Sequence, residues 1–225
     1  MPAVSHFWSL ILGTILALLP IINPLVAAPT FLAITEGDSE QRRRSQARKG
    51  CCYMVGILVS FLVGGTFLMN FFGLSIPGMR IAGGIVMTGM GMSMLGPSIG
   101  AGRPDASELE AARRKVDVSF SPLAIPLLSG PGSIAVTLGF TSLASSWLDY
   151  AAIILGIMVV AIISYAVLRL ADRLQGFIGP VGLNAMNKIM GFLIMCIGVQ
   201  FVVNGILAIA TDPELLHGIR AALHS

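Results

Sequence analysis

Two pairs of prolines, each flanked by small polar residues, lie inside stretches of the chain that carry no charge. Pro24 and Pro29 are five residues apart, and Pro126 and Pro131 repeat that spacing 102 residues later. Proline removes a backbone N–H and its ring clashes with the carbonyl four residues earlier, so each pair should interrupt a helix. Interrupted helices at corresponding positions in two halves of a membrane protein point to a binding site near the bilayer midplane.

These two breaks could hold both charges of a zwitterion without any charged side chain. A helix N-terminus presents free N–H groups to an anion, and a broken turn presents free carbonyls to a cation. The small residues beside the prolines are therefore the predicted substrate contacts. The first break supplies Asn23, Pro24, Ala27, Ala28, Pro29 and Thr30, the second supplies Ser129, Gly130, Pro131, Gly132 and Ser133, and Thr137, Gln200 and Asn204 are additional candidates. The alternative for each hydroxyl is a hydrogen bond to its own helix.

The composition is that of a membrane protein. The chain is 55% hydrophobic and 11% charged, whereas soluble domains carry about 25% charged residues. The basic residues lie in short loops between apolar runs, so a nucleic-acid partner is not expected. The three cysteines and three histidines show no ligand or disulfide spacing. We therefore expect no metal and no cofactor. No nucleophile–base pair lies within an apolar run, so we do not expect an enzyme.

Gaps between charged residues predict an all-α membrane protein with six transmembrane helices. The predicted spans are about 7–35, 50–71, 77–97, 119–143, 148–169 and 182–210. The loops after the first, third and fifth spans carry most of the Lys and Arg residues. The positive-inside rule places these loops in the cytoplasm. Both termini should then lie on the periplasmic side of a bacterial inner membrane.

A second pair of matching segments supports an internal duplication. The segment 80–87 is similar to the segment 188–195, at an offset of 108 residues. Three spans per unit place the second unit in the opposite orientation, as an inverted repeat with broken first and fourth helices. The predicted units are 1–97 and 119–211, joined by a cytoplasmic loop at 98–118. The tail 212–225 is either a short amphipathic interfacial helix or a frayed end.

With these motifs, the chain resembles the MarC family of bacterial inner-membrane proteins. The resemblance rests on Asn23-Pro24 with Pro29-Thr30, on the segment 121–126 leading to 129–134, and on the segments 182–185 and 199–201. This family looks related to the LysE-type exporters, which share a three-plus-three layout. Some members resemble transporters of small neutral amino acids such as glycine and alanine, which implies a similar substrate class here.

We therefore expect a secondary transporter or exporter of small neutral solutes, with a small-molecule substrate and the lipid bilayer as its partners. A homo-oligomer and a coupling ion remain open. The alternative is a non-transporting membrane protein that packs against a partner through glycine-rich faces.

Overall fold

The computed structural model describes residues 2–96, 117–141 and 143–212. Every regular element in these ranges is helical. Most of the predicted loop at 98–118 and nearly all of the predicted tail at 212–225 lie outside the described residues. The helices are α1 (Pro2–Ile22), α2 (Pro24–Ile34), α3 (Glu40–Phe72), α4 (Ile76–Leu95), η1 (Ser119–Leu128), α6 (Pro131–Phe140), α7 (Trp147–Arg169) and α8 (Ala171–Ala210).

By length and composition, four helices could cross a membrane on their own. They are Ser5–Ile22, Glu40–Phe72, Trp147–Arg169 and Val181–Ala210. The pair η1 and α6, bent by 67°, would make a fifth span. α4 has the length of a span, but five glycines and Arg80 make it less apolar than the others. The structure therefore supports an all-α protein with four or five candidate spans by length and composition, and it does not confirm the predicted six-helix inverted repeat.

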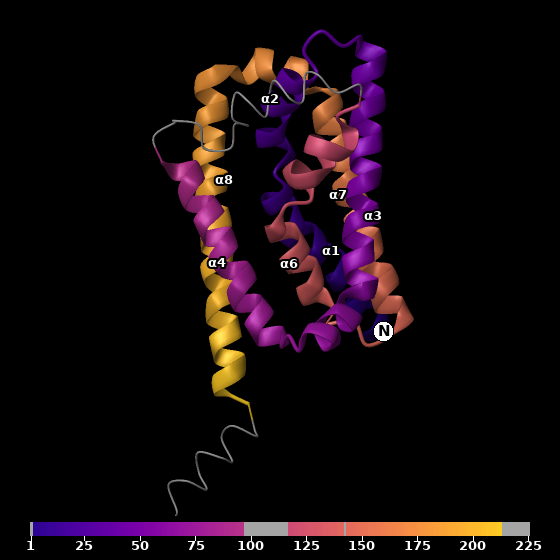
Figure 1. The fold of residues 1–225 in the computed structure, drawn as a ribbon, viewed down its shortest axis with the longest axis vertical. Coiled ribbons are helices and arrows are strands. Elements are labelled where there is room, and N and C mark those ends of the chain that lie inside the picture. The colour runs from indigo at the N-terminus through magenta and orange to yellow at the C-terminus, as the bar shows by residue number, and fades with distance from the viewer. Residues whose placement is uncertain (1, 97–116, 142, 213–225) are drawn as a thin grey trace, which may run out of the picture.

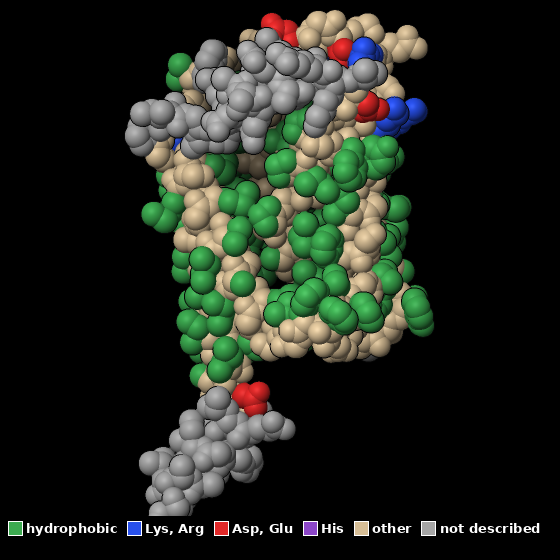
Figure 2. Space-filling model, in the orientation of Figure 1, with side chains coloured by type: hydrophobic (Ala, Val, Ile, Leu, Met, Phe, Trp, Pro, Cys, Tyr) green, Lys and Arg blue, Asp and Glu red, His purple; other side chains and the backbone are tan. Residues whose placement is uncertain are grey.

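The two ends of the molecule differ in charge. Figure 1 shows the start of α3 and the junction of α7 with α8 at one end, and the N-terminus and the end of α8 at the other. Arg43 of α3 contacts Asp172 of α8 through two hydrogen bonds of 2.8 and 3.0 Å. In Figure 2 most of the visible charged side chains gather at this end, and apolar side chains cover the flanks. This arrangement is that of a membrane-spanning body with one basic end.

Glycines bring α4 and α8 into close backbone contact. A methyl group built on Gly84 would lie 2.5 Å from the carbonyl oxygen of Gly198, and one on Gly91 would lie 2.5 Å from that of Gly191. Because the contact moves backward along α8 as it moves forward along α4, the two helices run antiparallel. Small residues allow membrane helices to approach this closely. α4 and α8 thus form one tightly packed pair (Figure 1).

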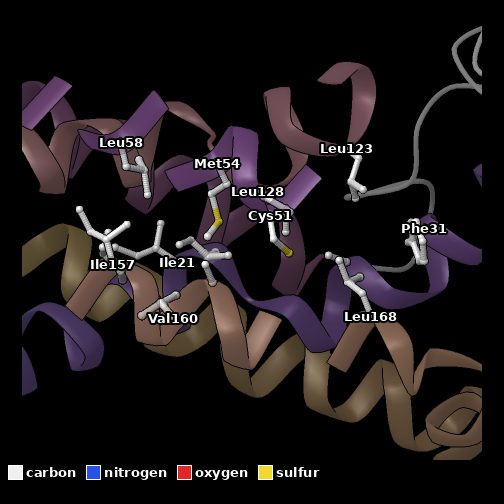
Figure 3. Packing of buried hydrophobic residues seen from close by; sticks show 14 of the residues in the cluster. Ile21, Phe31, Cys51, Met54, Leu58, Leu123, Leu128, Ile157, Val160 and Leu168 are labelled. Carbon is white, nitrogen blue, oxygen red and sulfur yellow. The ribbon is translucent and has the colours of Figure 1, made fainter. Parts of the chain in front are cut away.

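The buried core is formed mainly by side chains of α1, α2, α3, η1, α6 and α7, the helices around the two proline breaks. Phe31 of α2, Leu58 of α3, Leu123 of η1 and Ile157 of α7 are all fully buried and belong to one cluster (Figure 3). On the other face of α7, Gly156 leaves room for α1, since an added methyl group would lie 2.7 Å from Cβ of Thr14. Packing therefore fixes α1, α2 and η1, which carry or directly precede the two groups of predicted site residues.

Candidate functional site

The first break is a single residue between α1 and α2. Asn23 has a left-handed backbone with φ 42° and ψ 66°, a conformation that asparagine adopts more readily than most residues. Its Oδ1 accepts a hydrogen bond of 3.4 Å from the N–H of Val26, so Asn23 caps α2. Pro24 follows as the first residue of α2, where its missing N–H does not matter. Pro29 lies inside α2 without breaking it, so only the first proline of this pair makes the predicted interruption.

The second break extends over several residues. Within η1, Ser121 and Ile125 have extended backbones, and each precedes a proline through a cis peptide bond. The residue before a proline is disfavoured in the helical conformation, which accounts for these two extended positions. Ser129 and Gly130 then separate η1 from α6. α6 begins with Pro131, and no side chain caps its first turn.

The two breaks pack against each other inside the molecule. A methyl group built on Gly132 would lie 3.2 Å from Cγ2 of Ile21, two residues before Asn23. The same methyl group would lie 3.1 Å from Cγ of Met87 on α4, a fully buried side chain. The first turn of α6 therefore lies against the end of α1. The structure thus brings together two segments that the proline spacing had paired across the sequence.

Each break contains a buried polar atom without a hydrogen-bond partner. Asn23 is 6% exposed and its Nδ2 is unpaired, and Ser129 is 1% exposed and its Oγ is unpaired. An unsatisfied buried polar group costs about 1–3 kcal/mol. Six such side-chain atoms occur in the described part of the chain, and two of them lie at the paired breaks. The site therefore retains unused hydrogen-bonding capacity at a place where water is excluded.

Other predicted hydroxyls are already bonded to their own helix. Ser133 Oγ donates to the carbonyl of Gly130 at 2.9 Å, and Thr137 Oγ1 donates to the carbonyl of Ser133 at 2.7 Å. For these two residues the structure therefore shows the alternative, a hydrogen bond from the hydroxyl to its own helix, and not a free hydroxyl. Thr30 is buried at 7% exposure.

The apolar site candidates around the two breaks differ in how far they are buried. Pro24, Ala27 and Ala28 are buried on α2, and Pro131 is exposed at the start of α6. Pro29 and Gly130 are half-buried. The second break thus extends from the buried Ser129 to a residue on the surface of the chain.

Gln200 and Asn204 lie apart from the buried breaks. Both side chains are exposed on α8, and Gln200 Nε2 donates to Oδ1 of Asn204 at 2.8 Å. The structure does not bring them to the unpaired atoms of Asn23 and Ser129. Sequence reasoning also missed two buried residues, Met87 and Ser164. Ser164 Oγ is unpaired on the otherwise apolar α7, and a lone serine in such a run is the signal that could have identified it.

Comparisons with known proteins agree with the resemblance seen in the sequence. The family model "MarC family integral membrane protein" matches residues 8–210. The inner membrane protein MarC of Salmonella typhi is 34% identical over 205 residues, and that of Escherichia coli O1:K1 is 35% identical over 206 residues. Each alignment covers 87% of this chain and 93% of the relative. No solved structure matches the chain significantly.

Proposed function

The chain belongs to the MarC family of integral membrane proteins, and from that premise we propose that it is a secondary transporter or exporter of small zwitterionic solutes, such as small neutral amino acids. Its relatives named above are inner membrane proteins.

The observation that carries this proposal is the pair of unsatisfied polar atoms at the two opposed breaks. Asn23 Nδ2 is a donor, and Ser129 Oγ can donate or accept. Both atoms are buried without a partner. A ligand that hydrogen-bonds to them would recover part of the free energy that their burial costs. If the two breaks had only a structural role, leaving both atoms without hydrogen-bond partners would cost stability with no compensating function.

The helix ends around these atoms suit the two charged groups of a zwitterion. α6 begins without a side-chain cap, so its first-turn N–H groups and its positive dipole end can bind a carboxylate. Pro24 has no N–H to donate to the carbonyl of Pro20, four residues earlier, and in this proposal that carbonyl accepts from the ammonium group. No Asp, Glu, Lys or Arg lies in α2 or α6. A substrate with an extra full charge would therefore find no counter-charge on these two helices.

The relation between the two halves suits alternating access. The segments 80–87 and 188–195, which are similar in sequence, lie on the antiparallel pair α4 and α8. An inverted repeat of this kind can present one site to either side of the membrane in turn. We place the basic end with Arg43 in the cytoplasm by the positive-inside rule, so that both termini are periplasmic. At that end an ion pair of 2.8 Å between Arg43 and Asp172 joins α3 to α8.

The glycine-rich faces do not favour a scaffold function. Gly84, Gly91, Gly191 and Gly198 are already used in the contact between α4 and α8. They are therefore not available to a partner protein without separating those helices. For these four glycines, packing within the chain explains their presence without a partner protein.

Counterflow in proteoliposomes tests the proposal. Liposomes that contain the purified protein and are loaded with unlabelled alanine should accumulate radiolabelled alanine from outside faster than protein-free liposomes. Asn23→Gly and Ser129→Ala should reduce that rate, and Ser60→Ala should not, because the Ser60 hydroxyl is exposed and bonded to its own helix. The proposal fails if no small neutral amino acid exchanges and none raises the melting temperature of the protein.

A further inference from the structure

A pocket lies at the basic end of the molecule, away from the residues of the two breaks. Residues of α2, α3, α7 and α8 line this open pocket, whose ≈ 250 Å³ of empty space includes open solvent. Its apolar wall includes Phe31 and Leu168, which are 0% and 1% exposed. Its charged wall contains three arginines, Arg43, Arg44 and Arg169, and two carboxylates. The pocket therefore combines an apolar floor with a rim of guanidinium groups.

The charges around the pocket do not balance. Arg43 pairs with Asp172, and Arg44 pairs with Glu40. Arg169 has no ion-pair partner within the described part of the chain, and Nε of Arg43 is also unpaired. One net positive charge is thus left over at the rim. A ligand with one negative charge and several acceptor oxygens would match this surplus.

Among the helix ends at the pocket, the uncapped N-terminus of α8 adds to the positive potential. α3 begins at Glu40 and α8 begins at Ala171, and both first turns line the pocket through Glu40, Arg43 and Asp172. The first turn of α8 has no side-chain cap. Helix N-termini and arginine side chains are the two groups that proteins most often use for phosphate oxygens. The pocket is therefore built for an oxyanion.

The position of the pocket favours a lipid over a dissolved ion. The charged end adjoins the apolar flanks of the molecule in Figure 2, as expected at a bilayer surface. Basic pockets between membrane helices on the cytoplasmic side are suited to anionic headgroups.

We propose that this pocket binds a phosphate oxyanion, supplied by the headgroup of an anionic phospholipid. Arg169 and Nε of Arg43 hold the phosphate oxygens, and the uncapped first turn of α8 contributes its N–H groups and dipole. The site is independent of the transport proposal, because none of its residues lies at the two breaks.

Lipid binding to the purified full-length protein tests this assignment. Native mass spectrometry and thermal unfolding are measured with phosphatidylglycerol, with phosphatidylcholine, and with inorganic phosphate at matched ionic strength. Phosphatidylglycerol should be retained and should raise the melting temperature more than phosphatidylcholine. Arg169→Gln should weaken phosphatidylglycerol binding about fivefold, which corresponds to about 1 kcal/mol. Glu40→Gln should strengthen it, because a competing carboxylate is removed.

Arg173→Gln is the matched control. It removes the same charge one turn further along the chain, at an exposed position that does not line the pocket. Equal losses in Arg169→Gln and Arg173→Gln would overturn the site and leave only general surface attraction, as would a weaker affinity in Glu40→Gln. If inorganic phosphate alone stabilises the wild type but not Arg169→Gln, the oxyanion site is supported and its ligand is the free ion.

Discussion

The two halves of this molecule carry the same pair of prolines but interrupt their helices differently. In the first half one residue, Asn23, makes the break and caps the next helix with its own side chain. In the second half the backbone is irregular from Ser121 to Gly130, and α6 starts without a cap. The residue before the first proline decides this difference. Asparagine can adopt positive φ and cap a helix, whereas Ile125 before Pro126 can do neither.

The difference gives the two breaks complementary roles in the proposed site. The capped break offers an amide donor on a fixed backbone, and the uncapped break offers the end of a helix dipole. A symmetric pair of breaks would present the same group twice. The asymmetry therefore suits a ligand whose two ends differ.

The largest effect should come from the contact that joins the halves through α4 and α8. Gly198→Ala would place Cβ 2.6 Å from the backbone N of Thr88 and 2.7 Å from the carbonyl of Gly84. The helices must separate, and we expect the free energy of unfolding to fall by about 2–3 kcal/mol, which is the upper end of the range for overpacking. Gly139→Ala is the control, because its nearest atom lies at 3.9 Å. Equal melting temperatures for the two variants would contradict the close contact.

The next largest effects should come from substitutions of Asn23 that distinguish the role of its backbone conformation from the role of its side chain. Asn23→Leu loses the cap and places a branched residue at positive φ, so we expect about 2 kcal/mol of destabilisation. Asn23→Gly keeps the backbone and should change stability by only a few tenths of a kcal/mol. Binding of labelled alanine should nevertheless fall in Asn23→Gly, because the Nδ2 donor is gone. Unchanged affinity in that variant would remove Asn23 from the site.

The second break should show opposite effects on stability and on binding. Ser129→Ala removes a buried hydroxyl that has no partner, so the free energy of unfolding should stay constant or rise by less than about 1 kcal/mol. The affinity for alanine should fall about fivefold, the scale of one lost hydrogen bond. Calorimetric titration together with thermal unfolding measures both quantities. A variant that is less stable than the wild type but binds equally well would make Ser129 a structural residue.

The smallest effect should come from the hydrogen bonds of Asp117, for which the described part of the first half has no equivalent. At the start of the second half, Ser119 and Lys49 hydrogen-bond to Asp117 and lower its pKa from 3.8 to about 2. A carboxylate with a depressed pKa stabilises the fold above pH 3.8 and loses that contribution as the pH falls toward 2. The wild type should therefore lose slightly more stability than Asp117→Asn across this window. Because Asp117 is partly exposed, the difference is small, and identical pH profiles would mean that these hydrogen bonds contribute nothing.

The sequence predicted the position of the breaks better than their shape. Proline and apolar composition follow from local chemistry, so the interruption at Pro24 and the helical membrane fold could be predicted directly. The role of Pro29 could not, because the packing of α2 tolerates a proline that local rules would exclude. The unpaired atoms of Asn23 and Ser129 depend on which neighbours arrive from α1, α4 and α6. The ion pair of Arg43 with Asp172 spans 129 residues, and no local pattern encodes it.

A competition assay tests the central claim most directly. The purified protein binds labelled alanine in the presence of unlabelled alanine, aspartate, ornithine or alanine methyl ester. Burying an unpaired ion costs several kcal/mol, so alanine should compete about a hundredfold or more better than aspartate and ornithine. The methyl ester should not compete, because it has no carboxylate for the first turn of α6. Comparable inhibition by all four compounds would contradict a site built from two helix breaks and uncharged side chains.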